Sequence, residues 1–474
     1  MEGSTSHDFK ANATRELANA DLRAALSGSD RTFVAGRARV VANLPEFDAL
    51  RDAAVEIKNH TLANLDHYLE VWERRVREAG GHVHWAKDTA EARAIVLALC
   101  RRAGAKAVNK GKSMIAEECG INEMLEANGI RPVETDLGEY IIQIRRETPS
   151  HIIAPAIHLT KAQVEKSFRE THTGLDPARD LTEPRALLTE AREILRKKYF
   201  EAEVGITGAN FLVAETGSSI IVTNEGNGDL SQLLPRIHIV LASLEKVVPT
   251  LEDASTILRV LARSATGQEF STYTTLSTGP RRAGDLDGPE EYHVVVLDNG
   301  RSAMLGGEFH EMLRCIRCGA CMNHCPVYQA VGGHAYGWVY PGPMGAVLTP
   351  ALIGIEHAAP LPNASTFCGR CEQVCPMRIP LPGMMRKWRE REFDKGLTPR
   401  PARQGLKLWA AFATRPRLYR FATGLAMRSL ATLAGRKGRL RRLPLAGGWT
   451  RYREFPAPEG RTFQAMWAEK RGRA

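Results

Sequence analysis

Two cysteine-rich stretches decide how this chain folds: CIRCGACMNHCP at residues 315–326 and CGRCEQVCP at residues 368–376. Gaps of two or three residues allow successive thiolates to converge on one small cuboidal cluster, and the proline after the last cysteine turns the chain away. The pattern predicts two [4Fe–4S] clusters, in which the last cysteine of each run binds the other cluster. Two alternatives fit less well. A zinc ribbon needs two CxxC pairs, whereas the first run alone contains four cysteines. Disulfides suit short secreted chains, and this chain is long.

The second run is one cysteine shorter than the first, and Ser365 stands at the missing position. Under crossed ligation the first cluster has four thiolates and the second has three. The first set is Cys315, Cys318, Cys321 and Cys375, and the second is Cys325, Cys368 and Cys371. The second cluster is then [3Fe–4S], or [4Fe–4S] with Ser365, water or a partner group on the fourth iron. The simpler interpretation is that Ser365 caps a helix and the cluster has three protein ligands.

Length and composition predict a soluble protein of several domains. The 474 residues favour two to four domains, and no apolar stretch approaches the roughly 18 residues that span a bilayer. The first eight residues, MEGSTSHD, lack the basic and apolar regions of a signal peptide. We therefore expect a cytoplasmic chain whose thiols stay reduced.

The net charge of +10 is unevenly distributed along the chain. Residues 400–474 carry 18 Lys and Arg against three Asp and Glu, a balance of +15, so residues 1–399 sum to −5. The basic character therefore belongs to the tail. Because the body has no aromatic-studded basic stripe, we do not expect nucleic-acid binding.

Apolar periodicity divides the chain into four predicted parts. Residues 1–65 form a helical N-terminal segment. Residues 66–300 alternate strand-like and helix-like segments, which favours an α/β domain with an open, largely parallel sheet. Residues 301–395 hold both cysteine runs, and the 42-residue spacer between these runs favours an α-helical ferredoxin domain with helical flanks. Residues 396–474 form a basic tail.

Individual elements follow from the same patterns. The predicted strands are residues 81–85, 141–144, 152–154, 211–214, 219–222, 237–240 and 293–297. The predicted helices are residues 90–102, 114–127, 161–168, 184–200 and 251–264, with 309–315 and 382–393 flanking the cysteine runs. In the tail, Pro416 is expected to separate two basic amphipathic helices. Such helices bind an anionic membrane surface, a partner protein or the cluster domain.

Polar loops outside the cysteine runs are candidate sites. Gly111-Lys112-Ser113 is not a Walker A motif, because Lys106 stands where that motif needs its first glycine. These residues bind an anion, or Ser113 only caps the next helix, which is the interpretation we favour. Loops 215–218 and 223–228 lie at strand ends, where open α/β sheets bind ligands, although both also suit plain turns.

Histidines and the two remaining cysteines are expected to be structural. His151, His158 and His238 lie in or beside strand-like segments without other ligands at a recognisable spacing. Cys100 falls in an apolar helical segment, and the carboxylates beside Cys119 disfavour a reactive thiolate.

Several longer stretches carry a family resemblance. They are NKGKS (109–113), TDLGEY (135–140), SHIIAPAIH (150–158), TNEGNG (223–228), RSATGQ (263–268), GPRR (279–282), RCIRCGAC (314–321), GGHAYG (332–337) and FPAPEG (455–460). Through them the chain resembles the lactate utilisation protein B family, the iron–sulfur subunit of a three-protein L-lactate oxidation system. The resemblance runs from about residue 30 to the C-terminus.

The resemblance implies the same crossed assignment of the seven cysteines, with a serine matching Ser365 across the family. It also implies that residues of roughly 70–300 resemble sugar-phosphate isomerases and CoA transferases in fold. The leading hypothesis is therefore an electron-transfer subunit that acts with other lactate-utilisation subunits in the oxidation of L-lactate to pyruvate. Its electron acceptor stays unspecified, and its basic tail offers a peripheral membrane contact.

Two other functions stay open at the level of sequence. In one, the α/β domain itself binds and oxidises a 2-hydroxy acid, lactate or glycolate. The candidate residues for that role are Lys110, Lys112, Glu215, Asn224 and Arg281. In the other, the chain is a redox-sensing scaffold. Because no GxGxxG motif follows a strand, we expect the hydride acceptor on another subunit and no complete active site in this chain.

Overall fold

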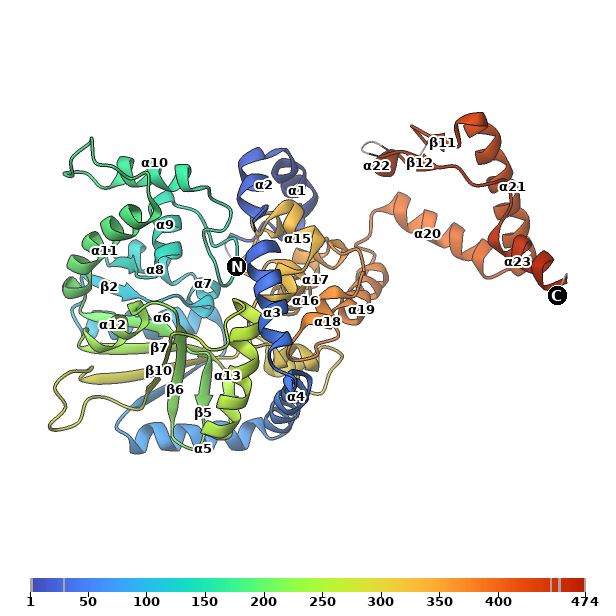
Figure 1. The fold of residues 1–474 in the computed structure, drawn as a ribbon. Helices are drawn as coiled ribbons and strands as arrows, with labels where there is room; N and C mark the ends of the chain where they lie inside the picture. The colour runs from blue at the N-terminus through green and yellow to red at the C-terminus, as the bar shows by residue number, and fades with distance from the viewer. Residues whose placement is uncertain (1–2, 29, 444–445, 451–452, 473–474) are drawn as a thin grey trace. The chain divides into compact units, whose positions relative to one another are not determined.

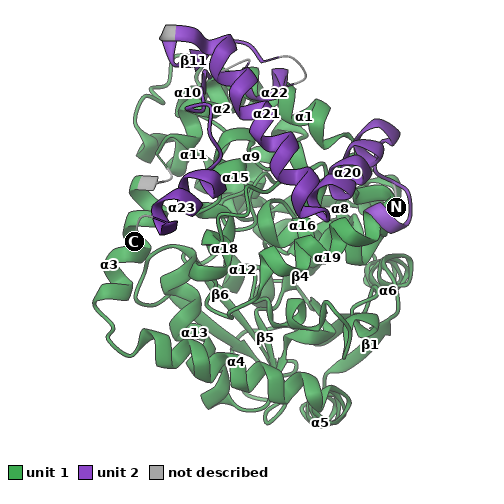
Figure 2. Ribbon diagram, turned by 90° about the vertical axis from the view of Figure 1, so that its right-hand side faces the viewer, with its two compact units in different colours: residues 1–392 green, residues 393–474 purple. Residues whose placement is uncertain are grey.

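The computed structural model describes residues 3–28, 30–443, 446–450 and 453–472. The chain divides into two compact units, Met1–Glu392 and Phe393–Ala474, which Figure 2 shows in different colours. The predicted boundaries at residues 65, 300 and 395 within this chain stay a prediction. The first unit contains both cysteine runs and both of the larger sheets.

A six-stranded parallel sheet forms the centre of the first unit (Figure 1). In spatial order its strands are β1 (His82–Ala86), β10 (Glu291–Leu297), β7 (Ile237–Ser243), β4 (Val204–Gly208), β2 (Ala107–Lys110) and β3 (Arg131–Glu134), and every neighbouring pair is parallel. The inner strands are rich in Val and Ile because both of their faces are buried. The predicted α/β fold with a parallel sheet is confirmed.

Helices cover both faces of this sheet. Alternate residues of one strand point to opposite faces, so Val295 packs with α6 (Thr89–Arg102) and α8 (Ile121–Ala127), while Val294 packs with α5 (Leu65–Glu78). The helix α12 (Asn227–Leu233) lies unusually close to β4. A Cβ atom on Gly205 would stand 1.8 Å from the carbonyl oxygen of Ser231, so only glycine permits this packing.

The first unit also contains a second sheet, which has four strands. Its strands are β8 (Val247–Val248), β5 (Phe211–Val213), β6 (Ser218–Thr223) and β9 (Tyr273–Ser277), in that spatial order. Strands β5 and β6 pair antiparallel, with Val213 opposite Ser218. The loop at residues 215–218 is therefore a hairpin turn. Helix α13 (Leu251–Ala265) follows β8 and begins with a capping box between Thr250 and Asp253.

Two predicted strands are wrong. Residues 141–144 lie in the helix α9 (Leu137–Arg145), because the Asp136 side chain accepts a hydrogen bond from the Glu139 amide and starts a helix there. Residues 152–154 form an irregular segment, held by two amides that donate to His151 Nδ1. A short apolar run does not reveal its period, and this is why both segments resembled strands.

The predicted helix at residues 114–127 is broken in two. Gly120 adopts a left-handed φ of 63° and ends α7 (Met114–Cys119) before α8 begins. The flank at 309–315 is a 3₁₀ turn, His310–Arg314, rather than an α-helix. The other predicted strands and helices of the first unit are present within one to three residues. The short strands β2, β3, β4, β8 and β9 were not predicted.

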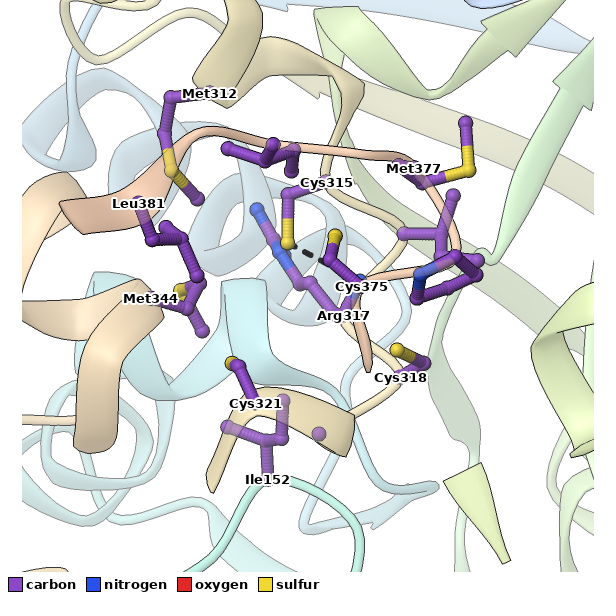
Figure 3. A pocket seen from close by; sticks show the side chains of 14 residues that line it. Ile152, Met312, Cys315, Arg317, Cys318, Cys321, Met344, Cys375, Met377 and Leu381 are labelled. Carbon is purple, nitrogen blue, oxygen red and sulfur yellow. Dashed lines mark hydrogen bonds between the residues drawn. The ribbon is translucent and has the colours of Figure 1, made fainter. Parts of the chain in front are cut away.

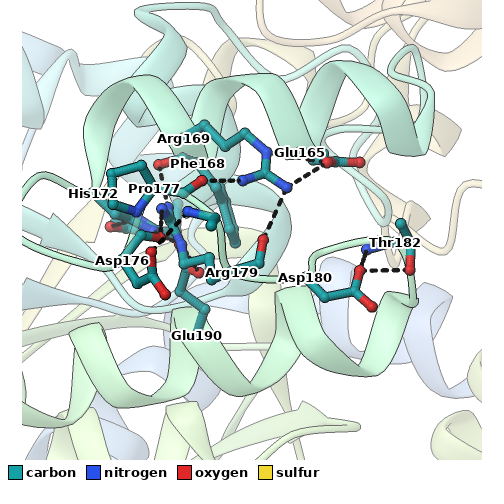
Figure 4. Close-up of polar contacts among 12 residues, drawn as sticks. Glu165, Phe168, Arg169, His172, Asp176, Pro177, Arg179, Asp180, Thr182 and Glu190 are labelled. Carbon is teal, nitrogen blue, oxygen red and sulfur yellow. Dashed lines mark hydrogen bonds and ion pairs between the residues drawn. The ribbon is translucent and has the colours of Figure 1, made fainter.

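Charge-assisted hydrogen bonds order the long connection between α10 (Lys161–Thr171) and α11 (Pro184–Glu201), as Figure 4 shows. The Arg179 guanidinium binds both oxygens of Glu190 at 2.6 and 3.0 Å, and this contact lowers the pKa of the Glu190 carboxyl below its usual range. Arg169 donates to the carbonyl oxygens of Pro177 and Arg179. The connection is thus fixed by polar contacts more than by apolar packing.

The cysteine runs lie in a helical domain, as predicted. Its helices are α14 (Ala320–Asn323), α15 (Pro326–Val331), α16 (Gly342–Ile353), α17 (Ile355–Ala358), α18 (Arg370–Val374) and α19 (Leu381–Asp394). The N-terminal helices α1 (Phe9–Ala18) and α4 (Phe47–Ala63) pack in the same core. Arg51 of α4 donates to the carbonyl oxygens of Gln373 and Cys375 at 3.0 and 2.7 Å. The N-terminal segment is therefore part of the cluster domain's support.

The second unit consists of helices joined by a short two-stranded ribbon. Its elements are α20 (Arg400–Ala413), α21 (Pro416–Ala434), β11 (Arg439–Leu440), α22 (Gly447–Thr450), β12 (Phe455–Pro456) and α23 (Phe463–Gly472). Pro416 is the first residue of α21, which confirms that it separates two helices. Among the described residues, no helix combines the length and the apolar character that are needed to cross a bilayer.

Candidate metal centre

The two cysteine runs begin with the same backbone turn. Arg317 and Phe367 both adopt a left-handed φ, 56° and 55°. The Arg317 amide lies 3.4 Å from Cys315 Sγ, and the Phe367 amide lies 3.1 Å from Ser365 Oγ. Ser365 therefore occupies in the second run the place that Cys315 occupies in the first.

The two cysteine runs also match at the start of the helix that follows each turn. Gly319 and Gly369, with φ of 73° and 77°, stand directly before α14 and α18. Gly369, and not Ser365, is the N-cap of α18, and no side chain caps that helix. The expectation that Ser365 caps a helix is therefore wrong. Its hydroxyl instead accepts a hydrogen bond within the ligand turn.

Four thiols surround one enclosed, apolar cavity. Cys315, Cys318, Cys321 and Cys375 line it together with Met312, Met344 and Leu381, as Figure 3 shows. Three of them come from the turn before α14 and from α14 itself, and the fourth follows α18. This is the set that crossed ligation predicts for the first cluster.

The remaining three thiols form a second group. Burial and, to a smaller extent, the neighbouring thiols of Cys325 and Cys368 raise the pKa of Cys371 to about 12. Burial also raises the pKa of Cys318, where the neighbours are Cys375 and Cys315. The thiols therefore interact within the two predicted sets. The assignment of each cysteine to a cluster stays a prediction.

The donor set fits iron–sulfur clusters. Buried thiols with a raised pKa stay protonated on their own, and bound metal is what stabilises thiolates in such a place. Seven soft sulfur donors in one helical domain suit iron and sulfide, whereas carboxylate or imidazole donors are absent from the described lining of the cavity. Because its turn matches that of Cys315, Ser365 stays the predicted fourth ligand of the second set.

Buried cations lie on the side of the first thiol set that faces the parallel sheet. Arg317 contacts Ser243 Oγ and Glu245 Oε1, both at 3.3 Å, and thereby links the cysteine turn to the end of β7. Lys58 donates to the carbonyl oxygens of Glu245 and Val247. Lys246 interacts with the Cys315 thiol and favours its ionised form. These charges offset the negative charge of thiolate ligands.

A second cavity, of about 320 Å³, opens at the carboxyl edge of the parallel sheet. The segments that follow β2, β4 and β7 form its floor, and the loop at residues 223–228 forms one wall. It shares four lining residues with the cavity of the first thiol set: Ile152, Ile316, Arg317 and Cys318. A molecule in this cavity would therefore lie beside Cys318, one of those four thiols.

Two of the five candidate residues for hydroxy-acid chemistry line this cavity, namely Lys112 and Asn224. Lys110 is instead buried beneath the sheet edge, where its Nζ contacts Glu117 at 2.7 Å and Glu134 at 2.8 Å. Burial and the Glu134 charge raise the pKa of the neighbouring Glu139 well above its usual range. Lys110 is thus enclosed by carboxylates and does not reach the cavity.

The other two candidates lie elsewhere. Glu215 accepts a hydrogen bond from the Leu251 amide at 3.2 Å, at the start of α13. Arg281 pairs with Glu290 at 2.9 Å on an exposed loop. Asn227 also lines the cavity, and it lies within the loop 223–228 that the sequence marked as a candidate site. Sequence reasoning missed Lys246, for which a position a few residues after a predicted strand was the only available signal.

The predicted Ser113 cap is confirmed, and the histidines expected to be structural have protein partners. Ser113 caps α7 by accepting from the Ala116 amide at 3.2 Å. The three histidines have structural partners: His151 contacts Asn323, His158 contacts Ser150 and Glu147, and His238 contacts Thr207. Burial raises the pKa of both Cys100 and Cys119 to about 12, which makes these thiols unreactive.

Three family models match consecutive parts of the chain. Family models described as "LUD domain", "4Fe-4S dicluster domain" and "Lactate utilisation protein B, C-terminal" match residues 69–297, 311–379 and 394–472. The dicluster match confirms the predicted iron–sulfur clusters.

Curated relatives are similar over nearly their full length. Lactate utilization protein B of Bacillus subtilis is 40% identical over 464 residues, covering 98% of this chain and 96% of that protein. The protein of the same name from Geobacillus kaustophilus is 43% identical over 452 residues, covering 94% of each chain. An uncharacterized electron transport protein, YkgF of Escherichia coli, is 38% identical over 463 residues, covering 98% and 96%.

Proposed function

The chain belongs to the lactate utilisation protein B family, and from this premise we propose that it transfers electrons in the oxidation of L-lactate to pyruvate. The observation that carries the proposal is the gathering of seven cysteines in one helical domain, where four of their thiols line a single cavity. Oxidation of lactate releases two electrons, whereas an iron–sulfur cluster accepts one at a time. Two clusters in one domain meet that requirement.

In this proposal Cys315, Cys318, Cys321 and Cys375 hold the first cluster. Cys325, Cys368 and Cys371 hold the second, with Ser365 at its fourth corner. When bound, the clusters supply one-electron redox chemistry. The thiols of Cys321 and Cys371 are close enough to interact electrostatically, which supports a short distance between the two sites.

The protein's own groups tune these sites. The Arg317 amide donates toward Cys315 Sγ, and an amide hydrogen bond to a sulfur ligand stabilises the reduced, more negative state. Burial lowers the pKa of Lys58 to about 8 and that of Lys246 to about 7, whereas the nearby Cys315 raises both, so negative charge on the cluster ligands favours the protonated amines. The first site is therefore expected to have the higher reduction potential, because these amines are buried, whereas Arg370, which interacts with the exposed Cys368, is itself exposed.

The proposal includes partner subunits. The sequence has no GxGxxG dinucleotide fingerprint, so the two-electron acceptor of lactate is assigned to another lactate-utilisation subunit in the cytoplasm. This chain then receives electrons from that subunit and passes them on. A redox-sensing scaffold is the competing function, and it requires no electron flow through the clusters.

Anaerobic reconstitution tests the proposal. Purified holoprotein is mixed with its partner subunits and L-lactate, and cluster reduction is followed by EPR and visible absorbance. We expect reduction of the clusters within turnover time, lost in Cys315→Ala and retained in Cys100→Ala, which removes a cysteine outside both sets. Absence of iron in the anaerobic protein, or full lactate oxidation by the partners without this chain, would contradict it.

A further inference from the structure

We propose that the 320 Å³ cavity at the carboxyl edge of the parallel sheet binds a small 2-hydroxy monocarboxylate such as L-lactate. The substrate class rests on the proposed function, whereas the binding site rests on the residues that line the cavity. Carboxyl edges of parallel sheets are where α/β folds place their ligands. Here that edge also adjoins the first thiol set.

The first argument is a buried lysine amine that forms no ion pair with a described residue. Lys246 lines the cavity and is 5% exposed. Its acidic neighbour Glu245 is already paired with Arg301 and Arg317, both at 3.3 Å. Within the described part of the chain, Lys246 Nζ has no hydrogen bond and no ion pair. A buried charge without a partner is costly, so an anion in the cavity would stabilise this arrangement.

The second argument is a buried acceptor without a donor. Asn227 also lines the cavity and is 9% exposed, and no described residue donates to its Oδ1 atom. Buried side-chain oxygens are almost always hydrogen-bonded in native proteins. A hydroxyl group on the ligand would supply the missing donor. A simple carboxylate such as propionate has no such donor, so the pair Lys246 and Asn227 favours a hydroxy acid.

The third argument is the balance of charge around the cavity. Its ionisable lining consists of three cations and two carboxylic acids, besides the Cys318 thiol. They are Lys112, Lys246, Arg317, Asp136 and Glu225. Lys112 donates to the Ile153 carbonyl oxygen and holds the loop that closes one side. Arg317 is already paired with Glu245, so Lys112 and Lys246 remain beside Asp136 and Glu225, and this balanced lining suits a small monoanion better than a dicarboxylate.

Because the site adjoins the first thiol set, ligand binding should also be detectable by EPR. Arg317 and Cys318 belong to both cavities, so an anion bound beside Lys246 changes the electrostatic field at the first thiol set. Binding is therefore expected to alter the EPR spectrum of the reduced holoprotein without any partner subunit present. This response is independent of catalytic turnover.

Anaerobic isothermal titration of the holoprotein tests the proposal, with L-lactate, propionate and inorganic phosphate as the probes. We expect saturable binding of L-lactate, weaker binding of propionate, and a loss of at least tenfold in L-lactate affinity in Lys246→Gln. In Asn227→Ala, the preference for L-lactate over propionate is expected to fall to about one. Arg281→Ala, on the exposed loop, is the matched control and should bind like the wild type.

Each outcome decides for or against the site. Lys112→Gln serves as a second cavity variant if Lys246→Gln loses iron, and it should also weaken L-lactate binding. No saturable binding by a protein with full iron content, or an unchanged lactate preference in Asn227→Ala, would overturn the inference. Equal binding of phosphate would overturn the hydroxy-acid assignment, because the cavity would then take anions in general.

A protein that passes electrons but binds no L-lactate overturns this inference alone, whereas one that binds L-lactate but passes no electrons overturns the proposed function alone.

Discussion

At the scale of single residues, Ser365 is the position where the two cysteine runs diverge. Its turn repeats that of Cys315, down to the left-handed residue two positions later and the amide that points at the side chain. The backbone is therefore already arranged for a ligand, and only the side chain differs. A hydroxyl is a far weaker iron ligand than a thiolate, so the fourth iron of this cluster is the one held least firmly.

From this we predict that Ser365→Cys completes the second ligand set. The variant is expected to hold about eight iron atoms per chain, the content of two [4Fe–4S] clusters, and to show no [3Fe–4S] EPR signal after brief exposure to air. Iron analysis and EPR check this. Thr366→Cys places a thiol one residue away and is the control. Identical behaviour of the two variants would mean that position 365 is not a ligand position.

A second residue-scale prediction concerns His238, which is buried and contacts Thr207. Burial lowers the pKa of His238 to about 3. Between the ordinary histidine pKa of about 6.5 and a pH of about 3, the unfolded chain therefore binds a proton that the folded chain does not. Stability falls as the pH falls through this window, with a slope of about 1.4 kcal/mol per pH unit from this residue alone.

Between pH 7 and about pH 5.5, the melting temperature of His238→Gln is therefore expected to fall less than that of the wild type. In this interval the unfolded histidine, with its ordinary pKa of about 6.5, takes up its proton. Differential scanning calorimetry of the two holoproteins measures this difference, since their clusters respond equally to acid. His67→Gln changes an exposed histidine and should keep the wild-type slope. A wild-type slope in His238→Gln would show that other groups cause the acid sensitivity.

At the scale of elements, the contact between α12 and β4 positions one wall of the cavity. Asn227 is the first residue of α12, and the helix reaches the sheet only because residue 205 has no side chain. Gly205→Ala places a Cβ atom 1.8 Å from a backbone oxygen that cannot move without the helix. We expect a loss of about 2–3 kcal/mol in stability, typical of an overpacked core.

The measurement is thermal unfolding beside Gly226→Ala. Gly226 immediately precedes α12, has an ordinary φ of −75°, and has no other atom within 4 Å of the place that an added Cβ would take. That control is expected to unfold near the wild-type temperature. Equal melting of the two variants would show that α12 adjusts freely. Weakened L-lactate binding in Gly205→Ala alone would in addition connect the helix position to the cavity.

At the scale of the whole molecule, charge and cluster ligands are separated along the chain. All seven cysteines of the two runs lie in the first unit, whereas residues 400–474 carry the balance of +15. The first unit should therefore hold its clusters without the tail. A chain that ends at residue 395 is expected to keep wild-type iron content and EPR spectra, measured after anaerobic purification. Loss of iron in that chain would show that the tail supports the cluster domain.

The sequence by itself determined the features that depend on short spacing. The cysteine runs, the Ser113 cap and the division of the tail at Pro416 could all be predicted, because each arises from residues a few positions apart. Longer apolar segments were less informative. Residues 141–144 and 152–154 resembled strands, since a short apolar run fits either period.

Only the tertiary structure decided which distant residues share a site. Lys246 follows β7, Asn227 begins α12, and Arg317 belongs to the cysteine turn, and they meet at one cavity because the strand order brings the carboxyl ends of β2, β4 and β7 together. The same packing keeps Lys110 out of the cavity by surrounding it with carboxylates. Local spacing specifies which chemistry a chain can hold, but the convergence of separate elements is set by packing over the whole sheet.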